Sequence, residues 1–179
     1  MKFLLWLGGG IAALWLVTTF VVQQYSIPSN SMEPTLAVND RVVVNHTAYL
    51  RSPVRRGDVI VFNGQDSLSA DETDFVKRVV GVGGDRVACC DAQGRVTVNG
   101  EPVDEQSYIF PGDSASEIAF DVEVPDDKLW VMGDHRSESA DSRSQMGMPG
   151  GGFVSINNVR GQVIAVMWPP SRIGLLRQQ

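Results

Sequence analysis

The hydrophobic and polar positions divide the chain into an apolar N-terminal segment and a longer part with strand-like patterning. Residues 3–22 contain no charged side chain. As a helix, with a rise of about 1.5 Å per residue, a segment of this length matches a hydrocarbon core of about 30 Å. The sequence therefore predicts an N-terminal transmembrane helix, with an anchor over residues 1–25 and one domain over residues 26–179.

A cleaved secretory signal is the alternative interpretation of the apolar segment. The apolar core of such a signal is usually about 7–15 residues long and is followed by small residues. Here the bulky residues Gln23, Gln24 and Tyr25 follow, so we favour an uncleaved anchor; both interpretations export the domain. Lys2 is the only charged side chain before the segment, and the positive-inside rule therefore places the N-terminus in the cytoplasm.

Beyond the apolar segment, short runs rich in β-branched residues alternate with turn-forming residues, which predicts strands. The runs cover residues 41–44, 58–62, 75–80, 86–90, 95–98, 101–103, 119–124, 129–132 and 163–168. No long apolar stripe at helical spacing accompanies them. Many short strands predict a mainly β domain, a partly open barrel or sandwich. Within it, Asn99 and Gly100 are a strong hairpin-turn signal, and we expect a small hairpin insertion at about 86–127.

Charge and cysteine content narrow the function classes. The net charge is −6 and the pI is about 4.8, which argues against a nucleic-acid partner because such proteins favour a basic face. The two cysteines, Cys89 and Cys90, are adjacent. They can form a vicinal disulfide or pair with other chains, but they are too few for a closed zinc site with four ligands. No metal site is expected.

Residues 29–36 form a hydroxyl-rich turn directly after the apolar segment. A serine there can reach substrates embedded in a membrane, but its hydroxyl is a weak nucleophile until a base takes its proton. Two bases are candidates. His135 lies next to Asp134 and near Asp141, which is the composition of a Ser-His-Asp triad. Lys77 lies in an apolar strand, and it can act only where a dry setting lowers its pKa from about 10.4 towards neutrality.

Four blocks of sequence, in this order and spacing, resemble those of the type I signal peptidases, the Ser-Lys membrane proteases. They are residues 28–36 (PSNSMEPTL), 56–62 (RGDVIVF), 77–85 (KRVVGVGGD) and 133–143 (GDHRSESADSR). With the predicted anchor they extend over nearly the whole chain. The single predicted span and the short length look like the Gram-positive and actinobacterial branch of that family.

The resemblance implies a role for several residues of these blocks. Carried over to this chain, the family's set is the nucleophile Ser31, the general base Lys77, Ser29 with the Ser31 backbone N–H as the oxyanion hole, the lysine-orienting Ser139, and the ion pair of Asp141 and Arg143 that holds the fourth block in place. Asp58, after a glycine, is expected to be a structural turn residue that accepts backbone N–H groups. The resemblance implies no metal or organic cofactor.

The resemblance also implies a substrate class and a location. The family cleaves signal peptides from exported preproteins after a small residue, with another small residue two positions earlier. The substrate is expected to lie extended along a strand edge, with the enzyme resting on the lipid bilayer and its domain outside the cytoplasm. Residues that match the family's substrate pocket are Ile27, Met32, Leu36, Phe75 and Val76.

Two alternatives and one departure accompany this interpretation. His135 stands where asparagine is common in the family; we interpret it as a loop substitution, not as the base. A Ser-Lys self-cleaving regulator shares a related β core but has no N-terminal span. An anchored β module that only binds partners has no use for a buried Lys77 within roughly 3 Å of Ser31. The sequence indicates no oligomeric state.

Overall fold

The computed structural model describes Trp6, Gly10, residues 22–65 and residues 67–176. The predicted transmembrane helix lies almost entirely outside these residues. Within the described part of the chain, no helix is long and apolar enough to cross a bilayer. Residues 22–25, predicted as the end of the anchor, belong to the first strand, β1 (Val22–Ser26).

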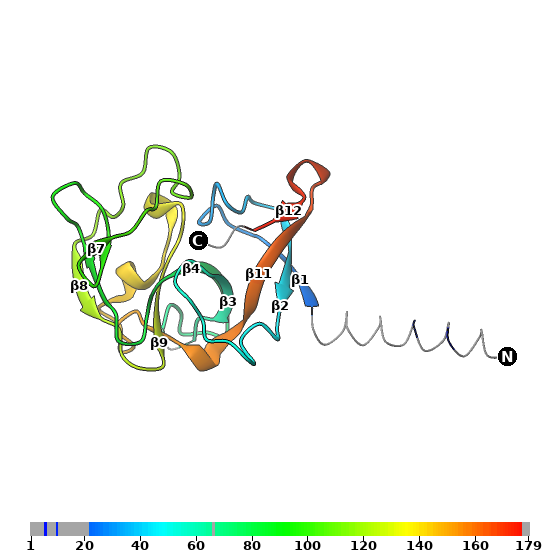
Figure 1. Cartoon of the computed structure of the whole chain (residues 1–179), viewed down its shortest axis with the longest axis horizontal. Coiled ribbons are helices and arrows are strands. Elements are labelled where there is room, and N and C mark those ends of the chain that lie inside the picture. Colours follow the sequence, from blue (N-terminus) through cyan, green and yellow to red (C-terminus); the bar gives the residue numbers. More distant parts are fainter. Residues whose placement is uncertain (1–5, 7–9, 11–21, 66, 177–179) are drawn as a thin grey trace.

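A curled antiparallel sheet forms the main body of the molecule (Figure 1). Its strand order is β1-β2-β11-β3-β4-β9-β10, and β12 pairs with β11. Besides β1 its strands are β2 (Arg41–Asn45), β3 (Val59–Asn63), β4 (Asp74–Val82), β9 (Lys128–Met132), β10 (Val154–Ser155), β11 (Val159–Trp168) and β12 (Gly174–Leu175). Every residue of β3 is buried, as expected for a central strand that is covered on both faces. The predicted mainly β, partly open sheet is confirmed.

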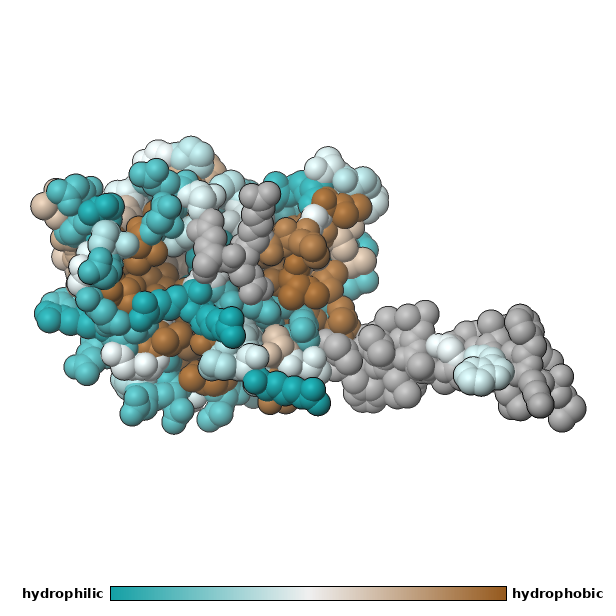
Figure 2. All heavy atoms as spheres, viewed as in Figure 1, coloured by the Kyte–Doolittle hydropathy of each residue, from teal (hydrophilic) through white to brown (hydrophobic). Residues whose placement is uncertain are grey.

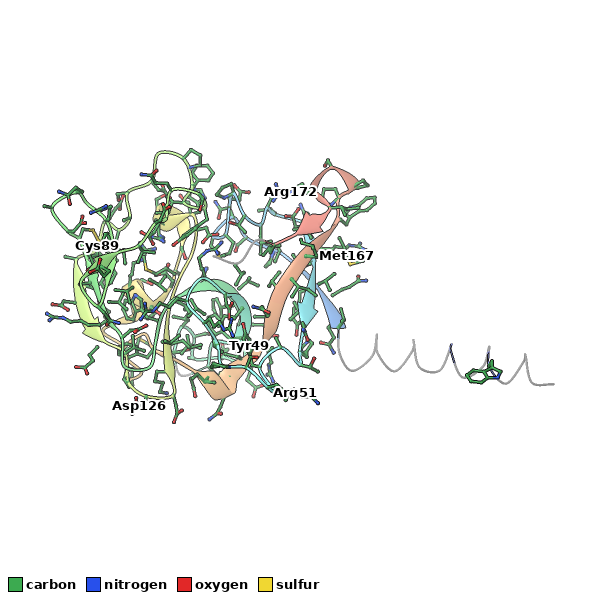
Figure 3. The ribbon with its side chains drawn as sticks, viewed as in Figure 1. Tyr49, Arg51, Cys89, Asp126, Met167 and Arg172 are labelled. Atoms are coloured by element: carbon green, nitrogen blue, oxygen red, sulfur yellow. A yellow bond between two sulfur atoms is a disulfide. The ribbon has the colours of Figure 1, made fainter. Side chains whose placement is uncertain are left out.

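A second, smaller sheet lies beside the main sheet and is built from residues of the segment 86–127. Its order is β7-β6-β5-β8, with β5 (Arg86–Cys89), β6 (Thr97–Val98), β7 (Glu101–Pro102) and β8 (Phe120–Glu123). Phe120 packs against Trp130 of β9, with ring centroids 5.3 Å apart, so the two sheets share one apolar cluster. At the end of β5, Cys89 is joined to Cys90 in a disulfide (Figure 3).

Within the residues that the structure describes, four short 3₁₀ helices occur in the connections between strands. They are η1 (Arg136–Glu138), η2 (Ser142–Gln145), η3 (Ile156–Asn158) and η4 (Pro170–Arg172). The first two lie in the segment between β9 and β10. Asp141 begins η2 with a capping box: its side chain accepts from the backbone, and the Ser144 side chain bonds back to the Asp141 N–H.

Candidate active site

The connection between β1 and β2 contains Ser31, and hydrogen bonds join its two ends. The Ile27 N–H donates to the Asp40 carbonyl over 2.9 Å, and the Asn39 N–H donates to the Ile27 carbonyl over 2.8 Å. Met32 and Leu36 are fully buried beneath the connection. These two buried side chains pack the turn against the sheet, so the backbone that carries Ser31 is rigidly held.

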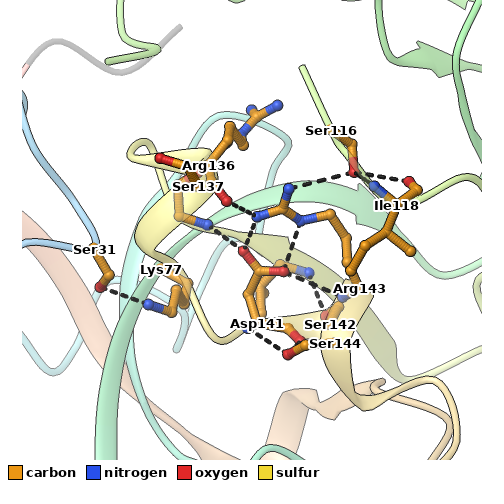
Figure 4. A network of polar contacts seen from close by, with 12 residues as sticks. Ser31, Lys77, Ser116, Ile118, Arg136, Ser137, Asp141, Ser142, Arg143 and Ser144 are labelled. Atoms are coloured by element: carbon orange, nitrogen blue, oxygen red, sulfur yellow. Dashed lines mark hydrogen bonds and ion pairs between the residues drawn. The ribbon is translucent and has the colours of Figure 1, made fainter. Parts of the chain in front are cut away.

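Lys77 approaches Ser31 from the middle of β4 (Figure 4). It stands opposite Ile60 of the fully buried β3, and it is only 3% exposed. Lys77 Nζ lies 2.6 Å from Ser31 Oγ, within hydrogen-bonding distance. The two residues are 46 positions apart in sequence. The distance between the two atoms is within the roughly 3 Å at which a base can take the proton of a nucleophile.

Burial lowers the pKa of Lys77 from its ordinary value of 10.5 to about 8. The charge of Asp141 raises this pKa, that of Arg143 lowers it, and that of Asp134 raises it, each by less than burial does. Removing an ammonium group from water disfavours its charged form. A measurable fraction of Lys77 is therefore neutral near pH 7–8, which is the form that can take a proton.

Asp141 and Arg143 form a buried ion pair with two hydrogen bonds, from Arg143 Nε over 2.9 Å and from Arg143 Nη2 over 2.8 Å. Asp141 also accepts from the Gly133 N–H over 2.9 Å, and Arg143 donates to the Arg136 carbonyl over 2.9 Å. These contacts tie the two ends of the segment 133–143 together (Figure 4). The architectural role of the pair stays a prediction.

The two other serines of the predicted set both lie near Ser31. Ser29 Oγ is 3.3 Å from Ser31 Oγ. Ser139 Oγ is buried and has no hydrogen-bond partner within the described part of the chain, Lys77 included. A Cβ built on Gly133 would come within 2.5 Å of both the Ser139 Cβ and the Ser31 carbonyl oxygen, so Ser139 lies beside the backbone of the nucleophile. Orientation of Lys77 by Ser139 stays a prediction.

His135 contacts Ser31 through its backbone. The His135 N–H donates to the Ser31 carbonyl over 3.2 Å, while its ring stacks on Phe110 with centroids 3.9 Å apart. Its Nδ1 is buried and has no hydrogen-bond partner among the described residues. Of the two candidate bases, Lys77 and not His135 therefore meets the Ser31 hydroxyl.

A cavity of about 360 Å³ opens beside the Ser31–Lys77 pair. Its lining includes four of the five predicted pocket residues, Ile27, Met32, Phe75 and Val76. The fifth, Leu36, lies in the apolar cluster beneath the Ser31 connection. Tyr25, Val61, Thr73 and Asp74 also line it and were not among the predicted pocket residues. The available signal for Tyr25 and Asp74 was their position three residues before a recognised block.

The described residues contain no group of three or more His, Cys, Asp or Glu side chains that could hold a metal ion. Asp58 is buried and accepts hydrogen bonds from Tyr49 Oη, the Arg55 N–H and Gln162 Nε2, each over 2.9 Å. It connects the turn before β3 with β11. Its structural role stays a prediction.

Comparison with known proteins identifies the family. A family model described as "Signal peptidase, peptidase S26" matches residues 1–168. The chain belongs to this family. A probable signal peptidase I of Mycobacterium leprae is 38% identical over 217 aligned positions, covering 92% of this chain and 74% of the relative. A probable signal peptidase I-2 of Synechocystis is 41% identical over 163 positions, covering 89% of this chain and 69% of the relative.

Among solved structures, a signal peptidase I from Enterococcus faecalis V583 matches with a TM-score of 0.46 and 23% sequence identity. The match covers 62% of this chain and 97% of that one. It adds nothing to the assignment, which rests on the family model and on the sequence relatives.

This member of the signal peptidase family contains a second buried ion pair next to the site, which sequence reasoning missed. Arg78 donates to both carboxylate oxygens of Asp134 over 2.8 and 2.7 Å and lies 4.1 Å from the Tyr108 ring. Asp134 also accepts from Thr35 Oγ1 over 2.5 Å. The pair thus connects β4, the Ser31 connection and the segment 133–143. A charged residue directly after Lys77 in an apolar strand was the available signal.

Proposed function

We propose that this chain is a membrane-anchored serine endopeptidase that removes N-terminal signal peptides from exported preproteins by a Ser31–Lys77 dyad. The observation that carries the proposal is the buried contact of 2.6 Å between Ser31 Oγ and Lys77 Nζ. A lysine in water has no use as a base at neutral pH, whereas one with a pKa of about 8 has. Membership of the family supplies the substrate class.

The geometry supports an acyl-enzyme mechanism. Neutral Lys77 takes the proton of Ser31 as its Oγ attacks the scissile carbonyl, and the Ser29 hydroxyl with the Ser31 N–H donates to the developing oxyanion. Protonated Lys77 then gives its proton to the leaving amine. In the second half, neutral Lys77 activates a water molecule that hydrolyses the ester. Each oxyanion donor is worth about 3–4 kcal/mol of transition-state stabilisation.

The lining of the cavity beside the dyad supports a preference for small residues. Ile27, Met32 and Val76 provide apolar walls. Large side chains would clash with walls that are themselves part of the packed core. An extended peptide would reach this cavity along β4, next to Phe75.

Substitution of the nucleophile tests the proposed function. In detergent, the purified wild type is expected to cut a preprotein after a small residue, and Ser31→Ala to lower kcat/KM by about 10³–10⁶-fold, because the covalent step is lost. Ser52→Ala, at an exposed serine, is the control and should match the wild type. Undiminished cleavage by Ser31→Ala would refute the dyad. An inert wild type would favour the module that only binds.

The membrane location is part of the proposal. The N-terminus is placed in the cytoplasm and the catalytic domain outside, following the charge of Lys2. An exposed apolar patch around the β11–β12 hairpin supports a lipid-facing side (Figures 2 and 3). It consists of Met167, Trp168, Ile173 and Leu175, of which Trp168 is 53% and Leu175 83% exposed. Such clustered apolar exposure is typical of surfaces that contact a partner or a membrane.

Trp168→Ser is expected to weaken the action on membrane-embedded substrate. Burial of one large apolar side chain contributes about 1.5–3 kcal/mol, so cleavage of a preprotein in lipid vesicles should fall roughly 10- to 150-fold. Cleavage of a short soluble peptide in detergent should not change. Leu50→Ser, at another exposed apolar residue, is the control. An equal loss on both substrates would show that Trp168 acts on catalysis and not on lipid contact.

A further inference from the structure

A segment outside the four recognised blocks packs against the active-site loop. Residues 105–116, here called the strap, connect β7 to β8 in the smaller sheet. The strap lies against the loop 133–143, which contains Asp141 and Arg143 and contacts Ser31. Its contacts with this loop are mostly polar and several of them are buried.

The strongest of these contacts is the ion pair between Glu105 of the strap and Arg136 of the loop. Arg136 Nη2 donates to Glu105 Oε1 over 2.5 Å, and Arg136 Nη1 lies 3.3 Å from Oε2. The side chains are only 2% exposed for Arg136 and 5% for Glu105. Tyr108 Oη also contacts Glu105 Oε1, over 3.2 Å. A buried guanidinium needs such a partner, because an unpaired charge in the interior is costly.

Arg136, held by Glu105, in turn bonds to the backbone of Gly133. Its Nε donates to the Gly133 carbonyl over 2.9 Å, and its Nη1 donates to the Ala115 carbonyl over 2.6 Å. The Gly133 N–H donates in turn to Asp141. The two polar groups of Gly133 are therefore held by two separate buried ion pairs, Glu105–Arg136 on the carbonyl and Asp141–Arg143 on the N–H.

The position of Gly133 matters because it packs directly on the nucleophile. A Cβ at this residue would come within 2.5 Å of the Ser31 carbonyl oxygen and of the Ser139 Cβ. A small displacement of Gly133 therefore moves the backbone of Ser31, whose N–H is proposed to bind the oxyanion. Misplacement of catalytic groups by about 1 Å can cost roughly 10²-fold in rate.

Further contacts hold the strap against the loop. The Phe110 N–H donates to the Asp134 carbonyl over 3.0 Å, and its ring stacks on His135. Asp113 accepts from Ser137 through the backbone N–H and the hydroxyl. These contacts fix the position of the strap on the loop. Among the described residues of the strap, Glu105 is the one whose buried carboxylate pairs with Arg136, the residue that bonds to the Gly133 carbonyl.

We propose that Glu105 is a positioning residue for the Ser31–Lys77 reaction. It neutralises and orients Arg136, which fixes the Gly133 carbonyl and thereby the backbone of Ser31. The inference rests on the proposed dyad mechanism, and it assigns to the smaller sheet a part in catalysis and not only in stability.

Glu105→Gln in the full-length protein tests the inference. With a soluble peptide substrate in detergent, kcat should fall about 10–100-fold, while KM stays within about twofold because the substrate cavity is unchanged. Asp121→Asn is the matched control: it breaks the ion pair of Asp121 with Arg86, which belongs to the same small sheet but is exposed. This control should retain the wild-type kcat.

A double variant separates positioning from stability. Glu105→Gln leaves Arg136 buried without a full partner, so its melting temperature should fall. Glu105→Leu combined with Arg136→Met removes both charges and should recover the melting temperature. If kcat remains low in this double variant, the loss comes from the missing bond to Gly133; if kcat returns with stability, the inference is wrong. A wild-type kcat in Glu105→Gln overturns it as well.

The wild type and Ser31→Ala are measured in the same assay. If the wild type is inert or Ser31→Ala is active, the proposed function is wrong, and the inference about Glu105, which depends on it, is wrong too. If both behave as expected and the double variant is fully active, the inference about Glu105 fails alone.

Discussion

Lys77→Arg is expected to abolish cleavage, with a fall in kcat/KM of at least about 10³-fold. Arginine carries a positive charge on a side chain at least as long as that of lysine, but it stays protonated in proteins, so it cannot take the Ser31 proton. The loss would therefore follow from missing base chemistry, not from missing charge. The assay is cleavage of a preprotein in detergent, with the melting temperature measured to show that the variant is folded.

Lys128→Arg provides the matched control, because Lys128 lies at the start of β9 and is only partly buried. It should cleave at the wild-type rate. If Lys77→Arg retained substantial turnover, the base would have to be another group. The first residue to replace would then be His135, whose backbone already contacts Ser31.

The strands and the candidate serine could be predicted from the sequence, because both depend on local patterns. Alternation of β-branched residues with turn formers placed the nine predicted runs within or next to observed strands. Strand β1 was missed because its first residues follow the apolar segment without a turn signal and were assigned to the anchor. The short strands β10 and β12 were missed because two residues are too few to show alternation. The equally short β6 and β7 were found because Asn99 and Gly100, a hairpin-turn signal, lie between them.

The choice between the two bases could not be made from residues alone. Both Lys77 and His135 were chemically possible, and the resemblance to signal peptidases favoured Lys77. What decides it physically is the pairing of β4 with β3 and the buried Ser31 connection, which together place Nζ at 2.6 Å from Oγ. These are long-range contacts, which no local pattern reports. The same holds for the Arg78–Asp134 and Glu105–Arg136 ion pairs.

The buried lysine has a cost in stability that follows from the same pKa. The pKa of Lys77 is lower in the folded state, about 8, than its ordinary value of 10.5. Below pH 8 the group is protonated in both states and its full cost, about 3 kcal/mol, opposes folding. The cost decreases as pH rises from about 8 to 10.5, since the folded state then releases its proton first. A residue that destabilises the fold in this way is understandable only through its chemistry.

Acidification is expected to suppress the reaction steeply, since only neutral Lys77 can act as base. With a pKa of about 8, half of the lysine is neutral at pH 8 and about one part in 10³ at pH 5, so kcat/KM should fall roughly 500-fold over this range. Below about pH 7 the profile should have a slope of one decade per pH unit. The measurement is kcat/KM on a soluble peptide from pH 5 to 9, with circular dichroism to show that the protein stays folded.

His135→Asn identifies the group that is responsible for this profile. The substitution removes the second candidate base but leaves the backbone N–H that bonds to Ser31 in place. If Lys77 is the base, the variant should keep the same midpoint and slope of the acid limb. A profile that stays flat down to pH 5 in the wild type would contradict the lysine mechanism. An acid limb that disappears in His135→Asn would assign the proton to the histidine instead.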